Sequence, residues 1–294
     1  MSQVLDHNSP RLGQGAVFLC AVLWSTSGLF IKLIDWDPIV IAGLRSIIAG
    51  LFMLTVRVLS ARRRKAPFKL RYLWGGGFAY SITMLLFVTA NKLTTSANAI
   101  LLQYSAPVWA ALLGWLLAKE KPRMVNWISL AMVIGGLCLF FKDGLAGGSS
   151  TGNLLALLSG ISFGANSVFL RIQKEGDPAD ALILAHFLTF LASIPFIFLH
   201  PPSFTIANTA SILFMGTIRL GMASLLFAYG IKRVPVVQAM LTAAIEPILN
   251  PVWVLLVTGE RPTIVALFGG MVIIAAVMVS TIGSPNKTRH KSQT

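Results

Sequence analysis

The sequence contains little charge, and acidic residues are especially rare. Charged residues occupy 12% of the 294 positions, with 24 Lys and Arg against 10 Asp and Glu, while hydrophobic residues occupy 55%. A water-soluble domain usually carries about 25% charged residues. The composition therefore indicates a protein whose solvent is lipid, with no soluble domain of useful size. The positive balance lies in short segments between apolar stretches, so it does not indicate nucleic-acid binding.

The residue types that build catalytic and metal sites are also scarce. The chain has two cysteines and four histidines. Cys20 and Cys138 each lie within an apolar stretch, where we interpret them as packing residues. The sequence contains neither an H-E-x-x-H metal motif nor a Walker phosphate loop. We therefore expect no enzyme activity, no catalytic residue, no metal and no cofactor.

Long apolar stretches fill almost the whole chain. A bilayer core about 30 Å thick requires about 20 apolar residues for each crossing helix. Stretches of this kind, separated by charged residues, proline or glycine, predict ten transmembrane helices, near residues 13–33, 38–59, 72–91, 94–117, 124–141, 152–171, 179–199, 208–231, 234–258 and 263–282.

The two halves of the chain resemble each other when they are offset by about 140 residues. Glu120-Lys121-Pro122 then aligns with Glu260-Arg261-Pro262, and Pro107 aligns with Pro247. We interpret residues 13–141 and 152–282 as two five-helix repeats, flanked by tails at 1–12 and 283–294. Proline inside a helix removes a backbone hydrogen bond, so Pro107 and Pro247 predict matching helix kinks.

The distribution of basic residues predicts the orientation. Most of the 24 Lys and Arg fall in segments on one side of a ten-helix arrangement, and only Lys32, Lys92, Lys142 and Arg261 fall on the other. Basic segments stay in the cytoplasm, so both termini should be cytoplasmic. Since each repeat has an odd number of crossings, the two repeats should be inverted. The predicted fold is an all-α integral membrane protein with inverted repeats around a central cavity.

Three ionisable residues fall inside predicted membrane helices. These are Arg45, Arg219 and Glu246. Charge in hydrocarbon costs about 2.5–3.5 kcal/mol on insertion scales, so such residues face a cavity or a partner. Arg219 and Glu246 have similar predicted depths, which allows two interpretations. They form a structural ion pair, or they face the cavity and hold a charged solute group.

Glu246 is also a candidate for proton coupling. Burial favours the neutral form of a carboxyl group, whereas a nearby Arg219 favours the charged form, so the sequence leaves its role open. His186 is a second candidate, since histidine titrates near neutral pH, although a lone histidine more often packs as a hydrogen-bonded core residue.

Uncharged polar and aromatic residues cluster in the opening helix of each repeat and in the proline-containing helices. We predict that Trp24, Ser25, Asn166, Gln103 and Tyr104 line the cavity, where polar groups and an aromatic surface would orient a solute. The alternative is helix packing, since small and hydroxyl residues allow close backbone approach and bond within their own helix.

These residues together resemble the EamA-type ten-helix exporters of the drug/metabolite transporter superfamily, in the general plan of YddG-like amino-acid exporters. The resemblance covers residues 13–282 and rests on Trp24-Ser25 followed by Lys32, Leu44-Arg45-Ser46, Pro107 with Glu120, and Glu246-Pro247 with Glu260. It implies a plasma-membrane carrier that exports amino acids or related metabolites. It also implies a central cavity near Trp24, Arg45, Tyr104, Asn166 and Glu246.

The predicted function is therefore alternating-access transport of a small polar metabolite, with amino-acid export favoured. Export of other metabolites, nucleobases or drugs is the main alternative, and a membrane-embedded enzyme or a channel is a weaker one. The expected partners are a small-molecule solute and the lipid bilayer. We expect a multi-pass protein of the inner (plasma) membrane that is a monomer or a homodimer.

Overall fold

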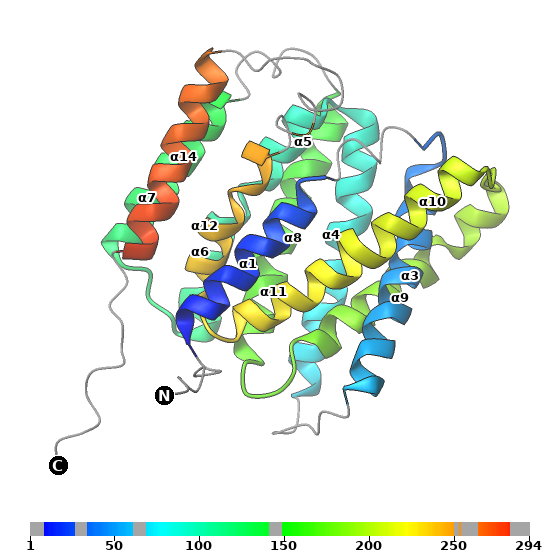
Figure 1. Cartoon of the computed structure of the whole chain (residues 1–294), viewed down its shortest axis with the longest axis horizontal. Coiled ribbons are helices and arrows are strands. Elements are labelled where there is room, and N and C mark those ends of the chain that lie inside the picture. Colours follow the sequence, from blue (N-terminus) through cyan, green and yellow to red (C-terminus); the bar gives the residue numbers. More distant parts are fainter. Residues whose placement is uncertain are drawn as a thin grey trace, which may run out of the picture.

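The computed structural model shows a bundle of helices (Figure 1). It describes residues 9–26, 34–60, 69–140, 149–249, 253 and 264–282. Within these residues the regular structure is entirely helical, without strands. Six of the helices are long and apolar enough to cross a membrane, namely Pro38–Leu59, Leu70–Leu93, Asn98–Ala118, Ser150–Ile172, Ala179–Leu199 and Ile206–Ile231. The predicted all-α membrane fold is confirmed.

Each of the ten predicted stretches contains helix. The first half forms α1 (Pro10–Trp24), α3 (Pro38–Leu59), α4 (Leu70–Leu93), α5 (Ser96–Gln103), α6 (Ala106–Ala118) and α7 (Met124–Phe140). The second half forms α8 (Ser150–Ile172), α9 (Ala179–Leu199), α10 (Ile206–Phe214), the π-helix η2 (Met215–Met222), α11 (Ala223–Ile231), α12 (Val236–Ala243) and α14 (Ile264–Ile282). The positions of the predicted stretches that lie outside the described part are 27–33, 141, 250–252, 254–258 and 263.

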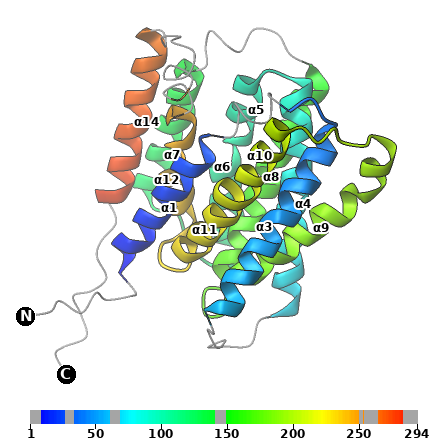
Figure 2. The same ribbon diagram turned by 45° about the vertical axis from the view of Figure 1, so that its right-hand side comes forward.

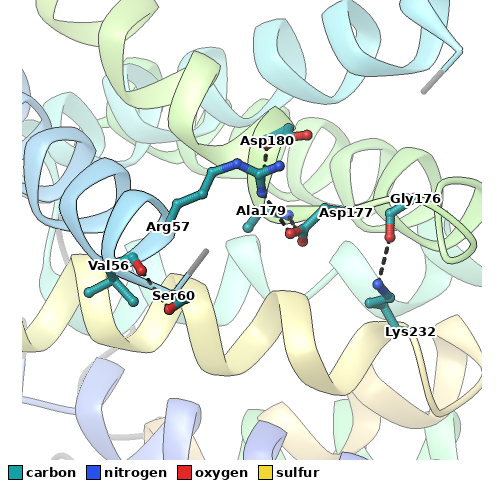
Figure 3. Close-up of polar contacts among 8 residues, drawn as sticks. All are labelled: Val56, Arg57, Ser60, Gly176, Asp177, Ala179, Asp180 and Lys232. Atoms are coloured by element: carbon teal, nitrogen blue, oxygen red, sulfur yellow. Dashed lines mark hydrogen bonds and ion pairs between the residues drawn. The ribbon is translucent and has the colours of Figure 1, made fainter. Parts of the chain in front are cut away.

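Helices α3 and α9, which occupy the same position in the two repeats, run in opposite directions. At the end of α3, Arg57 Nη1 lies 2.7 Å from Asp177 and 2.9 Å from Asp180 at the start of α9 (Figure 3). At the other end, Trp36 Nε1 donates to Ser203 at 3.2 Å. Because the end of each helix meets the beginning of its mate, the two repeats are inverted.

Helices α4 and α8 pack against each other at the centre of the bundle, and α7 and α14 lie side by side at one edge (Figures 1 and 2). Small residues allow this close packing. A Cβ atom added at Gly164 of α8 would lie 2.8 Å from the backbone oxygen of Ala106 in α6. The contact between α8 and α6 therefore depends on glycine at this position.

Two of the predicted helices are interrupted just before Pro107 and Pro247, where the sequence predicts kinks, and a third contains a π-helical turn. The stretch 94–117 breaks at Tyr104 and Ser105, between α5 and α6. The stretch 234–258 breaks after Ala243, at the end of α12, and 208–231 contains η2. Both breaks lie two to four residues before a proline, at Pro107 and Pro247. Proline has no N–H, and its ring clashes with the carbonyl four residues earlier, which belongs to Gln103 at the end of α5 and to Ala243 at the end of α12.

The close packing at Gly164 predicts the effect of a single methyl group. We expect Gly164→Ala to lower the thermal unfolding midpoint in detergent, because overpacking costs about 1–3 kcal/mol. Gly135→Ala is the matched control, since a Cβ there has nothing within 4 Å. It should leave the midpoint unchanged or slightly higher. Equal unfolding midpoints for both variants would contradict the assigned α6–α8 packing.

Candidate functional site

A cavity of about 40 Å³ lies among helices from both repeats. This volume holds about three water molecules, so an amino-acid-sized solute would require the helices to separate. The cavity is lined by Trp24 of α1, Arg45 of α3, Tyr80, Thr83, Met84 and Phe87 of α4, Gln103 of α5, Phe163 of α8, Arg219 and Leu220 of η2, and Glu246. Five of the predicted site residues therefore meet here: Trp24, Arg45, Gln103, Arg219 and Glu246.

Each of the two buried arginines has at least one N–H group without a hydrogen-bond partner in the described part of the chain. Arg45 is 1% exposed, and its Nη2 contacts the sulfur of Met84 at 3.6 Å. Arg219 is 5% exposed, and its Nη2 lies 3.5 Å from the backbone oxygen of Trp24. Among the described residues, no hydrogen-bond partner is found for Nε and Nη1 of Arg45 or for Nε of Arg219. Since buried charge normally requires partners, these groups are suited to bind an anion that enters the cavity.

The π-helix places Arg219 on the cavity. A π-helical turn adds one residue to the ordinary spacing and changes which side chains share a face, and such turns are frequent at functional sites. Within the described part of the chain, no ion pair within 4.0 Å joins Arg219 to Glu246. Of the two interpretations of these residues, the structure therefore offers no support for the direct pair.

Glu246 instead contacts Tyr104, across the two broken helices. The Tyr104 hydroxyl lies 2.9 Å from Oε2 of Glu246 and 2.8 Å from the backbone oxygen of Ala243. The hydroxyl has one proton. When it donates to Ala243, its oxygen can accept a hydrogen bond from protonated Glu246, and when it donates to Glu246, the carboxylate is charged. The contact thus accommodates both protonation states of Glu246.

Aromatic rings form one wall of the cavity. The ring centroids of Trp24 and Phe163 are 5.6 Å apart, those of Trp24 and Phe227 are 5.3 Å apart, and those of Phe163 and Phe227 are 5.9 Å apart. Tyr80 lies 6.3 Å from Phe163. We call Trp24, Phe163 and Phe227 the aromatic layer.

Four predicted site residues do not line the cavity. The Ser25 hydroxyl donates to the Val22 carbonyl at 2.6 Å and accepts from Trp253 Nε1 at 2.7 Å. Both contacts are within the protein, so the hydroxyl has a structural role. Tyr104 acts through its contact with Glu246. The other two are fully buried in helix interfaces and are described next.

Asn166 and His186 are buried and do not line the cavity. Asn166 is 0% exposed, and neither its side-chain oxygen nor its nitrogen has a partner among the described residues. His186 is also 0% exposed, with Nε2 3.4 Å from the Ser224 hydroxyl and its ring 5.7 Å from that of Tyr80. Of the two proton-coupling candidates, only Glu246 faces the cavity.

The residues of α4 were missed by the sequence analysis. Tyr80, Thr83, Met84 and Phe87 follow the spacing i, i+3, i+4 and i+7, which places them on one helix face. The sequence signal for these residues was the recurrence of aromatic and hydroxyl side chains at this helical spacing. That signal was weak, because α4 is apolar on all sides and its sequence does not show which face points toward the cavity.

The chain is similar to known transporters over most of its length. It matches the model of the EamA-like transporter family over residues 11–142 and 150–282. It is 26% identical to an uncharacterized transporter of Archaeoglobus fulgidus, over 92% of this chain and 96% of that protein. It is 28% identical to the uncharacterized transporter YdfC of Bacillus subtilis, over 87% and 86%. A crystal structure with 20% sequence identity has a similar fold, with a TM-score of 0.77 over 92% of this chain and 99% of that one.

Nε and Nη1 of Arg45 have no hydrogen-bond partner among the described residues, which predicts that this residue does not stabilise the fold. We expect Arg45→Met to unfold at the same or a higher temperature than the parent, since replacing a poorly paired buried charge with an apolar side chain is often neutral or stabilising. Arg171→Met is the matched control. Arg171 bonds to Glu120 and to two backbone oxygens, so its loss leaves acceptors unsatisfied at a cost of about 1–3 kcal/mol.

Thermal unfolding in detergent measures both variants. A loss of stability in Arg45→Met as large as that in Arg171→Met would show that Arg45 has structural partners, and would contradict its assignment to solute binding.

Proposed function

Because this chain belongs to the EamA-like transporter family, we propose that it carries small metabolites bearing a carboxylate, amino acids foremost, out of the cell. The transport mechanism in this proposal is alternating access, in which the cavity opens to one side of the membrane at a time. The inverted repeats support this mechanism, since two similar halves of opposite orientation can exchange conformations.

The observation that carries the proposal is the pair of buried arginines with unpartnered N–H groups on one cavity. Two guanidinium groups face one carboxyl group, Glu246, so the cavity favours a negatively charged group on the solute. A guanidinium offers donors in a planar fork that matches a carboxylate. A cationic solute would instead meet two positive charges in the cavity.

In this proposal the cavity residues have distinct roles. Arg45 or Arg219 receives the carboxylate of the solute, and Glu246 receives its amine or a proton. Gln103 can bond to further polar groups, and Trp24 provides an apolar surface. An amine that binds Glu246 would compete with Tyr104 for the carboxyl group, so binding would weaken a contact between the two broken helices.

The proposed location is the inner (plasma) membrane, with both termini in the cytoplasm. Apolar helices and the transporter family support a multi-pass membrane protein. The uneven distribution of basic residues supports the orientation.

Counterflow into proteoliposomes tests the choice of solute. Liposomes loaded with an unlabelled candidate are diluted into a radiolabelled amino acid, and uptake is measured. We expect amino acids, and the matching acids without the amine, to drive uptake. The matching amines without the carboxylate should fail, together with nucleobases and cationic drugs. Uptake driven by the amines or the cationic drugs alone would overturn the carboxylate assignment. Flux without counterflow would indicate a channel.

Substitutions in the cavity test the roles. We expect Arg45→Gln to lower kcat/KM at least about tenfold, because a hydrogen bond to a charged group contributes about 1.5–3 kcal/mol. Glu246→Gln keeps the shape of the side chain and removes its charge and its titration, so it should impair transport too. Transport by Glu246→Gln at the parental rate would discard the role proposed for Glu246. Lys121→Gln, which removes an exposed charge outside the cavity, serves as the control.

A further inference from the structure

Glu120 and Arg171 form a compact polar cluster at one end of the bundle. Arg171 Nε donates to Oε1 of Glu120 at 2.7 Å. Arg171 Nη1 donates to the backbone oxygens of Ile231 and Lys232 at 3.0 and 2.8 Å. Oε2 of Glu120 accepts from the backbone N–H of Val236 at 3.1 Å. We call this set of contacts the clamp.

The clamp joins four helix ends. Glu120 follows α6, Arg171 lies in the last turn of α8, Ile231 ends α11, and Val236 begins α12. The last carbonyls of a helix and its first N–H groups have no partners within the helix. The helix dipole favours a cation at the C-terminal end and an anion at the N-terminal end. Arg171 and Glu120 supply these charges on either side of the α11–α12 turn.

The backbone is bent to place Glu120 in the clamp. Lys119 has a left-handed conformation, with φ of 57°, and the N–H of Glu120 donates to the Gly114 carbonyl at 3.1 Å. A left-handed conformation costs a residue with a side chain about 1–3 kcal/mol and persists where the surroundings require it. The strained turn is therefore maintained by contacts such as those of the clamp.

The aromatic layer lies between the clamp and the cavity. Phe227 precedes Ile231 by one helical turn, about 6 Å along α11, whereas Arg219 lies two further turns away. Trp24 and Phe163 line the cavity and contact Phe227. From the cavity toward this end of the bundle, the path therefore meets three packed rings and then the clamp.

We propose that the clamp is the gate at this end, which must open before the cavity can reach the solution on that side. Glu120 belongs to the first repeat, whereas Arg171, Ile231 and Val236 belong to the second, so relative movement of the repeats pulls the clamp apart. The side chains of Arg171 and Glu120 are 11% and 23% exposed, so they can enter water when the contacts break. This inference rests on the alternating access proposed above, but it needs no particular solute.

Two other polar contacts at the same end of the bundle join different helices. Arg57 joins α3 to the start of α9, and Lys232 Nζ donates to the Gly176 carbonyl at 2.6 Å, which holds the end of α11 to the turn before α9 (Figure 3). Neither contact involves α6 or α12. Loss of the clamp should therefore weaken the attachment of α6 to the second repeat and leave these two contacts in place.

Thiol labelling from each side of the membrane tests the gate. In a background with Cys20→Ala and Cys138→Ala, Thr83→Cys places a reporter on the cavity wall. A membrane-impermeant anionic thiol reagent is applied to vesicles of both orientations. A separate variant, Lys121→Cys, identifies the orientation that exposes the clamp end.

We expect Glu120→Gln and Arg171→Lys each to speed labelling of the reporter from the clamp end by about tenfold, which corresponds to about 1.4 kcal/mol. Lys121→Gln should leave the rate unchanged. Labelling from the opposite end should not rise. If either clamp variant folds poorly in detergent, the other provides the test, since Arg171→Lys keeps the charge.

Two outcomes would overturn the proposal. One is parental labelling from the clamp end in both variants, while the reporter stays reactive from the opposite end. The other is an equal increase from both ends, which would show general loosening of the bundle. A failure of the carboxylate assignment would leave this labelling unaffected, so the two proposals are tested separately.

Discussion

The hydrocarbon core of a membrane supplies no hydrogen-bond partners, so every polar group within it must find one inside the protein. The breaks in this bundle follow that constraint. Where α5 ends, Tyr104 reaches the Ala243 carbonyl near the end of α12, and where α1 ends, Ser25 bonds to Val22 and Trp253. Each of these side chains allows a helix to stop within the fold.

Arg45 and Arg219 are the exceptions that give the cavity its chemistry. They are buried, and part of each guanidinium has no partner among the described residues, although a charge in this environment is costly. An anionic solute would supply the missing partners for as long as it is bound. The same constraint that shapes the fold is therefore the physical basis of the carboxylate recognition that we propose.

Much of this could be predicted from the sequence, because its strongest signals are properties of single residues. Hydropathy alone predicts the ten apolar stretches, and the match between the two halves of the chain predicts the repeats. Charged residues are rare inside apolar stretches, so Arg45, Arg219 and Glu246 stand out. The direction in which a side chain points depends instead on how each helix is rotated in the bundle. The sequence therefore predicts Asn166 in the cavity lining, where the structure does not have it. It does not predict Tyr80 of α4, which lines the cavity. The π-helix at Arg219 and the left-handed turn at Lys119 depend on packing, which a hydropathy pattern does not encode.

A structure of the protein with a bound carboxylate-bearing solute tests the central claim most directly. The account predicts density for the carboxylate within hydrogen-bond distance of Nε or Nη1 of Arg45, or of Nε of Arg219. A solute bound elsewhere, with the two arginines paired to Glu246 or to other protein groups, would contradict it.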